Sequence, residues 1–171
     1  PETLMGVGGY IASFVIYPFT HDYINSLTFV EAVIFSVFIM GACIAYYRLL
    51  VKRLHFNRFS AIASELLFFI SFFLLFKHLN QPSYSGFWTV DLSCVFFYLI
   101  PGLLNASVMM YMEGTSDFST TYKAMSNLDK GIFILTLYFT LFSNTQLTII
   151  IATYSFFKII QAFLENQRKI D

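Results

Sequence analysis

The sequence predicts an all-α integral membrane protein: a polytopic helical bundle of about six hydrophobic segments, four to six of them true spans. Two observations predict this class. Hydrophobic residues make up 57% of the chain and charged residues only 12%, whereas soluble domains average about 25% charged residues. The apolar residues also form long runs, such as LLFFISFFLLF at 66–76, which leave no face of a helix for water.

The same composition excludes two broad classes of protein. A soluble domain of this size needs polar residues to cover the surface that folding leaves exposed. A nucleic-acid-binding domain carries a basic patch, whereas this chain has a net charge of zero. Aromatic residues reach 20%, and we expect most of them to face acyl chains or the membrane interface. We therefore expect one transmembrane domain over 1–171, with the lipid bilayer as its solvent.

Apolar runs of about 20 residues, the length that crosses a bilayer as a helix, define the first four segments. Residues 28–50, 59–76 and 92–112 are nearly uninterrupted, and each is predicted to span the membrane. Residues 4–19 would make a helix only about 24 Å long, and their three glycines and Pro18 weaken it. We expect this first segment to be a short span or a half-inserted one.

The last apolar stretch, 128–164, is too long for one crossing. Four polar residues, Ser143 to Gln146, interrupt its middle. The sequence therefore favours a hairpin of two helices, 128–142 and 147–164. One long tilted crossing is the alternative.

Lysine and arginine residues predict the orientation, because short cytoplasmic loops carry an excess of them. A basic patch of Arg48, Lys52, Arg53 and Arg58 surrounds the connection 51–58. If this connection is cytoplasmic, alternating spans place the connection 113–127 and both termini in the cytoplasm too, an N-in/C-in arrangement. Only Lys77 then falls outside. Binding of anionic lipid or of a partner is the alternative reading of the patch.

Ionisable residues inside a bilayer are functional candidates, because burying them is costly. Glu65 and Lys158 lie at similar depths from the cytoplasmic ends of their segments. They are expected to pair across helices, unless Lys158 extends alone to the interface. A proton or cation path through Glu65, or contacts between subunits, are the remaining interpretations.

The stretch Pro101-Gly102 followed by Asn105 interrupts the fourth segment. Proline removes a backbone donor and kinks a helix. Transporters use such broken helices to build substrate sites near the middle of the membrane. Because proline and glycine are frequent in membrane helices, the stretch is read either as a packing kink or as part of a substrate site or gate.

Sequence motifs for catalysis or metal binding are missing. The chain contains no HExxH, Gly-x-Ser-x-Gly, CxxC or P-loop motif. His21 and His78 are predicted at the same outer face and are the only pair that could ligate a haem or a metal. We expect no cofactor and no metal site, and an enzyme is the less favoured reading.

Three function classes remain open. The leading expectation is a non-enzymatic channel- or transport-type component, acting as a homo-oligomer or as the membrane subunit of a larger assembly. The second is a membrane sensor, or an immunity, phage-defence or exclusion-type protein, that acts on a partner through residues 48–58 and 113–130. The third is a small membrane redox or lipid enzyme that uses the two histidines. For each class we expect a prokaryotic inner (plasma) membrane and no direct binding of nucleic acid.

Overall fold

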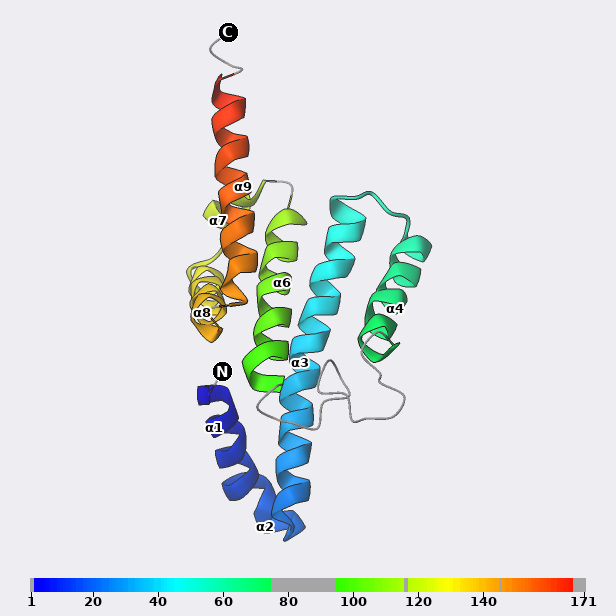
Figure 1. Ribbon diagram of the computed structural model, residues 1–171, viewed down its shortest axis with the longest axis vertical. Helices are drawn as coiled ribbons and strands as arrows, with labels where there is room; N and C mark the ends of the chain where they lie inside the picture. Colours follow the sequence, from blue (N-terminus) through cyan, green and yellow to red (C-terminus); the bar gives the residue numbers. More distant parts are fainter. Residues whose placement is uncertain (1, 75–94, 116, 145, 168–171) are drawn as a thin grey trace.

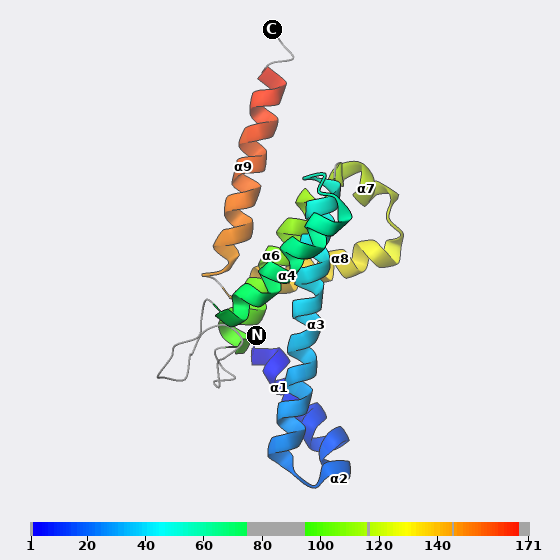
Figure 2. The same ribbon diagram turned by 90° about the vertical axis from the view of Figure 1, so that its right-hand side faces the viewer.

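The computed structural model describes residues 2–74, 95–115, 117–144 and 146–167, and within these residues it contains helices and no strands. This confirms the predicted all-α class. The long helices α3, α4 and α6 lie side by side, while α8 and α9 extend from one flank (Figure 1). Figure 2 shows that α8 runs across the direction of α3 and α9.

The N-terminal arm folds back along α3. It consists of α1 (Glu2–Ile11), a π-helical turn η1 (Ala12–Ile16) and α2 (Tyr17–Thr20). His21 then adopts a left-handed backbone with φ of 53°, and Asp22 caps α3 by accepting a hydrogen bond from the Asn25 amide. The arm lies beside the N-terminal half of α3 (Figure 1). By length it is a short apolar helix rather than one that would fully span a bilayer.

Helix α3 (Tyr23–Lys52) covers the expected segment 28–50 and packs against the N-terminal arm, α4 and α6. Its buried residues include Ala42 and Ala45, and small side chains let neighbouring helices approach closely. Helix α4 (Arg58–Leu74) follows after a short connection. Asn57 caps the start of this helix, because its Oδ1 accepts a hydrogen bond from the Ser60 amide. The last two residues of the expected segment 59–76 lie outside the described residues.

The fourth segment begins with a π-helical turn, η3 (Val95–Leu99), and continues as α6 (Ile100–Glu113). Helix α6 runs in the same direction as α3, so the C-terminal ends of both helices meet (Figure 1). Gly114 makes this approach possible, because a Cβ atom there would lie 3.2 Å from the Leu49 Cα of α3. The connections after α3 and after α6 therefore lie at the same end of the molecule, as the alternating spans required.

Part of the connection 113–127 is helical, which the sequence analysis missed. Helix α7 (Phe118–Ala124) starts at Asp117, whose carboxylate accepts hydrogen bonds from the Thr120 hydroxyl and amide. These hydrogen bonds lower the pKa of Asp117 below its usual value, and the one from the Thr120 hydroxyl contributes most. The Asp-x-x-Thr spacing is a capping signal that could have predicted this helix.

The C-terminal apolar stretch divides into two helices at the expected break. Helices α8 (Asn127–Ser143) and α9 (Thr148–Gln167) begin and end near the predicted bounds. Their axes differ by 118°, so the pair is either a broken span or a re-entrant loop. The C-terminal half of α9 extends beyond the ends of α3 and α6 (Figures 1 and 2).

Fewer helices qualify as membrane spans than the four to six predicted. Among the described residues, Tyr23–Lys52 and Val95–Glu113 are long and apolar enough to cross a bilayer, and the bent pair α8–α9 would count as a third. The other two predicted spans fall short in length: the N-terminal arm is a shorter apolar helix, and the described part of α4 has 17 residues.

Candidate functional site

The first group of polar contacts lies where α6 and the α8–α9 turn are both interrupted. Pro101 has no backbone N–H, so the Phe97 carbonyl one turn earlier lacks its usual intrahelical donor. The Asn144 side chain, from the turn between α8 and α9, donates a hydrogen bond of 2.6 Å to that carbonyl. The residue that breaks the second helix thus satisfies the backbone group that the proline leaves free in the first.

Asn105 joins the same region, one turn further along α6. Its side chain is fully buried and donates to the Pro101 carbonyl at 2.9 Å and to the Thr140 carbonyl of α8 at 3.3 Å. Its Oδ1 atom has no hydrogen-bond partner within the described residues. A buried acceptor without a donor is unfavourable unless something else satisfies it.

Asn144 also organises its own turn. Its Oδ1 accepts hydrogen bonds from the amides of Gln146 and Leu147, and Leu147 lies against Gly102, where a Cβ atom would be 3.8 Å from the Leu147 side chain. We call this region the helix-break junction and define it by Phe97, Pro101, Asn105, Thr140 and Asn144. It unites the predicted kink at Pro101, Gly102 and Asn105 with the predicted polar interruption at 143–146. The sequence marked both features but could not bring them together.

Two carboxylates at α3, one on this helix and one packed against it, form no ion pair within the described residues. Glu65 of α4 lies beside the Cys43 thiol, although neither carboxylate oxygen accepts a hydrogen bond of standard geometry. Glu31 is buried under α1, next to Gly8, and its oxygens are also unpartnered within the described residues. The expected ion pair between Glu65 and Lys158 is therefore not formed.

Lys158 contacts Glu113 instead, in a cluster that the sequence analysis did not find. The Lys158 Nζ atom lies 2.7 Å from Glu113 Oε2, and the Arg53 Nε atom lies 3.2 Å from Oε1. The Tyr154 hydroxyl donates a third contact to Oε2 at 3.0 Å. We call these four residues the Glu113 cluster. It links the ends of α3 and α6 to the middle of α9, and both ion pairs of the described residues belong to it.

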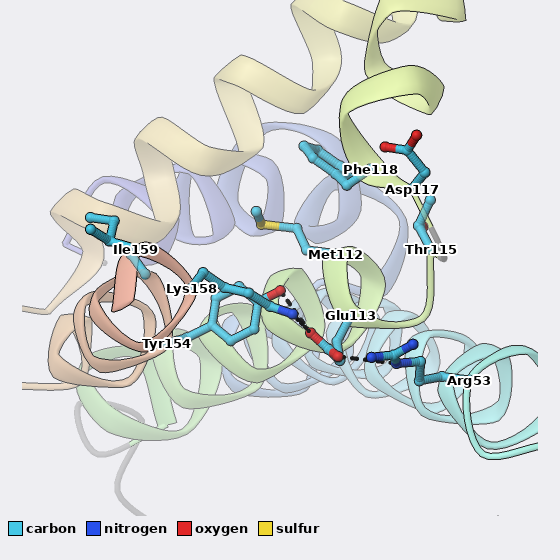
Figure 3. Close-up of a pocket in the computed structure, with 10 residues that line it drawn as sticks. Arg53, Met112, Glu113, Thr115, Asp117, Phe118, Tyr154, Lys158 and Ile159 are labelled. Atoms are coloured by element: carbon cyan, nitrogen blue, oxygen red, sulfur yellow. Dashed lines mark hydrogen bonds and ion pairs between the residues drawn. The ribbon is translucent and has the colours of Figure 1, made fainter. Parts of the chain in front are cut away.

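The cations approach Glu113 from opposite sides, beside an open pocket of about 400 Å³ (Figure 3). Met112, Phe118 and Ile159 supply apolar walls, while Asp117 lies at the far edge. Tyr154 and Lys158 are four residues apart on α9 and therefore share a helix face. This spacing is the signal that the sequence offers for the cluster, but Glu113 falls in the predicted connection 113–127, outside any predicted helix.

The predicted basic patch is divided among several contacts. Arg53 belongs to the Glu113 cluster, and the Arg48 guanidinium lies over the Tyr111 ring at 5.1 Å from its centre. Lys52 ends α3 and Arg58 begins α4. The patch therefore both pairs with α6 and leaves charge on the surface at this end of the molecule.

No support for a metal or haem site comes from the described residues, where no group of three or more His, Cys, Asp or Glu side chains converges. His21 ends α2, and His78 lies outside the described residues. No protein-family model, curated protein or solved structure matches this chain significantly.

Proposed function

We propose that this chain is a non-enzymatic membrane component that moves or gates a small ion or solute, as a homo-oligomer or as the membrane subunit of a larger assembly. The observation that carries the proposal is the helix-break junction, where two interrupted apolar helices meet. Four to six crossings, an N-in/C-in orientation and a prokaryotic inner membrane are parts of the same proposal.

Interrupted helices support transport because of how backbone behaves in lipid. Unpaired backbone groups are tolerated at membrane depth only where protein buries them or where they line a water-filled cavity. Paired broken helices form the substrate sites of several transporter folds. At this junction the buried Asn105 Oδ1 remains available as an acceptor, which suits a cation or a hydrogen-bond donor.

The unpartnered carboxylates support the same proposal. Each is placed within an apolar helix, where an uncompensated charge is expensive and is usually retained for function. Glu31 belongs to α3 and Glu65 lies against it, so protons or cations that reach this helix could be bound at two levels along it. The exposed apolar side chains of α4, α8 and α9 form a surface around this core that lipid or neighbouring subunits can contact.

The test is ion flux in proteoliposomes. Purified protein is reconstituted, and proton, sodium, potassium and chloride movements are followed with ion-sensitive dyes under imposed gradients. We expect flux of at least one ion above that of empty vesicles, and a reduction on Asn105→Ala and on Glu65→Gln. Ser107→Ala is the matched control, because within the described residues its hydroxyl donates to the Leu103 carbonyl of its own helix. Flux equal to that of empty vesicles for all four ions, or equal in all variants, would contradict the proposal.

A second candidate function, a sensor or immunity-type protein that docks a partner, is supported by the Glu113 cluster. The Arg53 to Glu113 ion pair brings the connections after α3 and α6 together at one end. Together they could form one composite docking face. Charge reversal at Lys52 and Arg58, which lie outside the cluster, should then abolish recovery of a partner by crosslinking in native membranes. Unchanged partner recovery in correctly inserted variants would eliminate this candidate.

A further inference from the structure

The pocket beside the Glu113 cluster contains hydrogen-bond donors that the cluster leaves unused. Arg53 contacts Glu113 through Nε alone, and within the described residues its two terminal nitrogens have no partner. Lys158 carries three N–H donors, and one contact to Glu113 is formed. The side chains of Arg53 and Lys158 are 49% and 41% exposed, so a ligand can reach both.

The charges that line the pocket balance one another. Arg53 and Lys158 face the Glu113 carboxylate, and Asp117 at the far edge supplies the second negative charge. Asp117 accepts two hydrogen bonds from Thr120 as the cap of α7, so the donors that remain for a ligand are those of Arg53 and Lys158. Guanidinium and ammonium groups bind phosphate oxygens well, and a phosphodiester carries a single negative charge.

The walls and the position of the pocket decide which phosphate it suits. Met112, Phe118 and Ile159 line it with apolar surface, which free inorganic phosphate cannot use. The pocket lies at the ends of α3 and α6, where the two spanning helices would leave the hydrocarbon of the bilayer. A lipid there would place its phosphate between the cations and its glycerol and upper acyl chains against the apolar wall.

We therefore propose that this pocket binds an anionic phospholipid, with Arg53 and Lys158 as ligands of the headgroup phosphodiester. Glu113 holds the two cations apart and competes with the lipid for them. The site is distinct from the helix-break junction, and lipid binding does not depend on whether the protein transports anything.

The experiment uses the full chain purified in a mild detergent. Phosphatidylglycerol is titrated and bound lipid is counted by native mass spectrometry, with phosphatidylcholine and inorganic phosphate as separate probes. We expect saturable binding of phosphatidylglycerol that Arg53→Gln and Lys158→Gln each weaken about tenfold, since a charge-assisted hydrogen bond is lost. Lys52→Gln and Arg58→Gln are matched controls, because they remove charges at the same end but outside the pocket.

Glu113→Gln separates ligand binding from a structural role of the cluster. Removing the competing carboxylate should strengthen phosphatidylglycerol binding, whereas loss of a structural scaffold would weaken it. An unchanged elution volume in size-exclusion chromatography identifies the variants that remain folded. Equal weakening by all four basic variants would show diffuse surface attraction and overturn the proposal. Displacement of the lipid by inorganic phosphate at equal concentration would overturn the assignment to a lipid.

Discussion

The hydrogen bond between Asn144 and the Phe97 carbonyl should measurably stabilise the protein, because Pro101 lacks the backbone N–H from which this carbonyl would accept in a regular α-helix. Asn144→Ala removes this hydrogen bond together with the acceptor for two turn amides. An unsatisfied buried acceptor costs about 1–3 kcal/mol, although interhelical hydrogen bonds in membranes average only about 0.6 kcal/mol. Loss of the turn contacts adds roughly 1 kcal/mol. We expect the free energy of unfolding to fall by about 2 kcal/mol.

Pro101→Ala provides the decisive comparison. Alanine restores the backbone N–H, which can donate to the Phe97 carbonyl of η3 one turn earlier. Asn144→Ala should therefore cost about 1 kcal/mol less in the Pro101→Ala background than in the native chain. The assay is unfolding in mixed micelles titrated with sodium dodecyl sulfate and followed by helical circular dichroism. If Asn144→Ala has the same effect in both backgrounds, the Asn144 side chain does not compensate for the proline, and the reasoning is refuted.

Two further predictions concern packing and charge. Gly114→Ala should lower the free energy of unfolding by about 1–3 kcal/mol, because its Cβ would lie 3.2 Å from the Leu49 backbone; Gly41→Ala, with open space around it, should be neutral or stabilising in the same micelle titration. Carboxylate removal should have opposite effects at two sites. Glu65→Met should raise the free energy of unfolding by about 1–3 kcal/mol, since its oxygens are unpartnered within the described residues, whereas Glu113→Gln should lower it by about 1 kcal/mol, and the same sign for both would contradict the assigned environments.

The helical class and most helix bounds could be predicted because they depend on local composition. An apolar run such as 28–50 has few alternatives to a helix in lipid, and α3 covers it. The short helix α7 was not predicted, because the length of apolar runs identifies membrane spans only. The local signal for α7 is the cap at Asp117. The 118° bend between α8 and α9 accompanies a hydrogen bond from Asn144 to the Phe97 carbonyl, and no local pattern encodes a contact at that separation.

The pairing of charged residues was predictable only in part. Depth along each segment correctly marked Lys158 as a residue that needs compensation, but depth alone does not identify the partner. Gly114 lets the end of α6 reach α3 and places Glu113 between Arg53 and Lys158. Glu65 faces Cys43 instead. The packing of α6 on α3 determines that Lys158 pairs with Glu113 and not with Glu65. This packing is a long-range contact, which helix periodicity does not predict.

The contact between Phe97 and Asn144 also has a consequence for biosynthesis, because its two partners are 47 residues apart in the chain. At about 5–20 residues per second, Asn144 leaves the ribosome roughly 2–9 s after Phe97. During that interval the Phe97 carbonyl of the nascent fourth segment lacks the Asn144 donor. Until Asn144 is made, the Phe97 carbonyl needs another donor, such as an insertion factor or a water molecule, or the segment needs to enter the lipid later. Chains stalled before Asn144 should therefore be preferred substrates for membrane proteases.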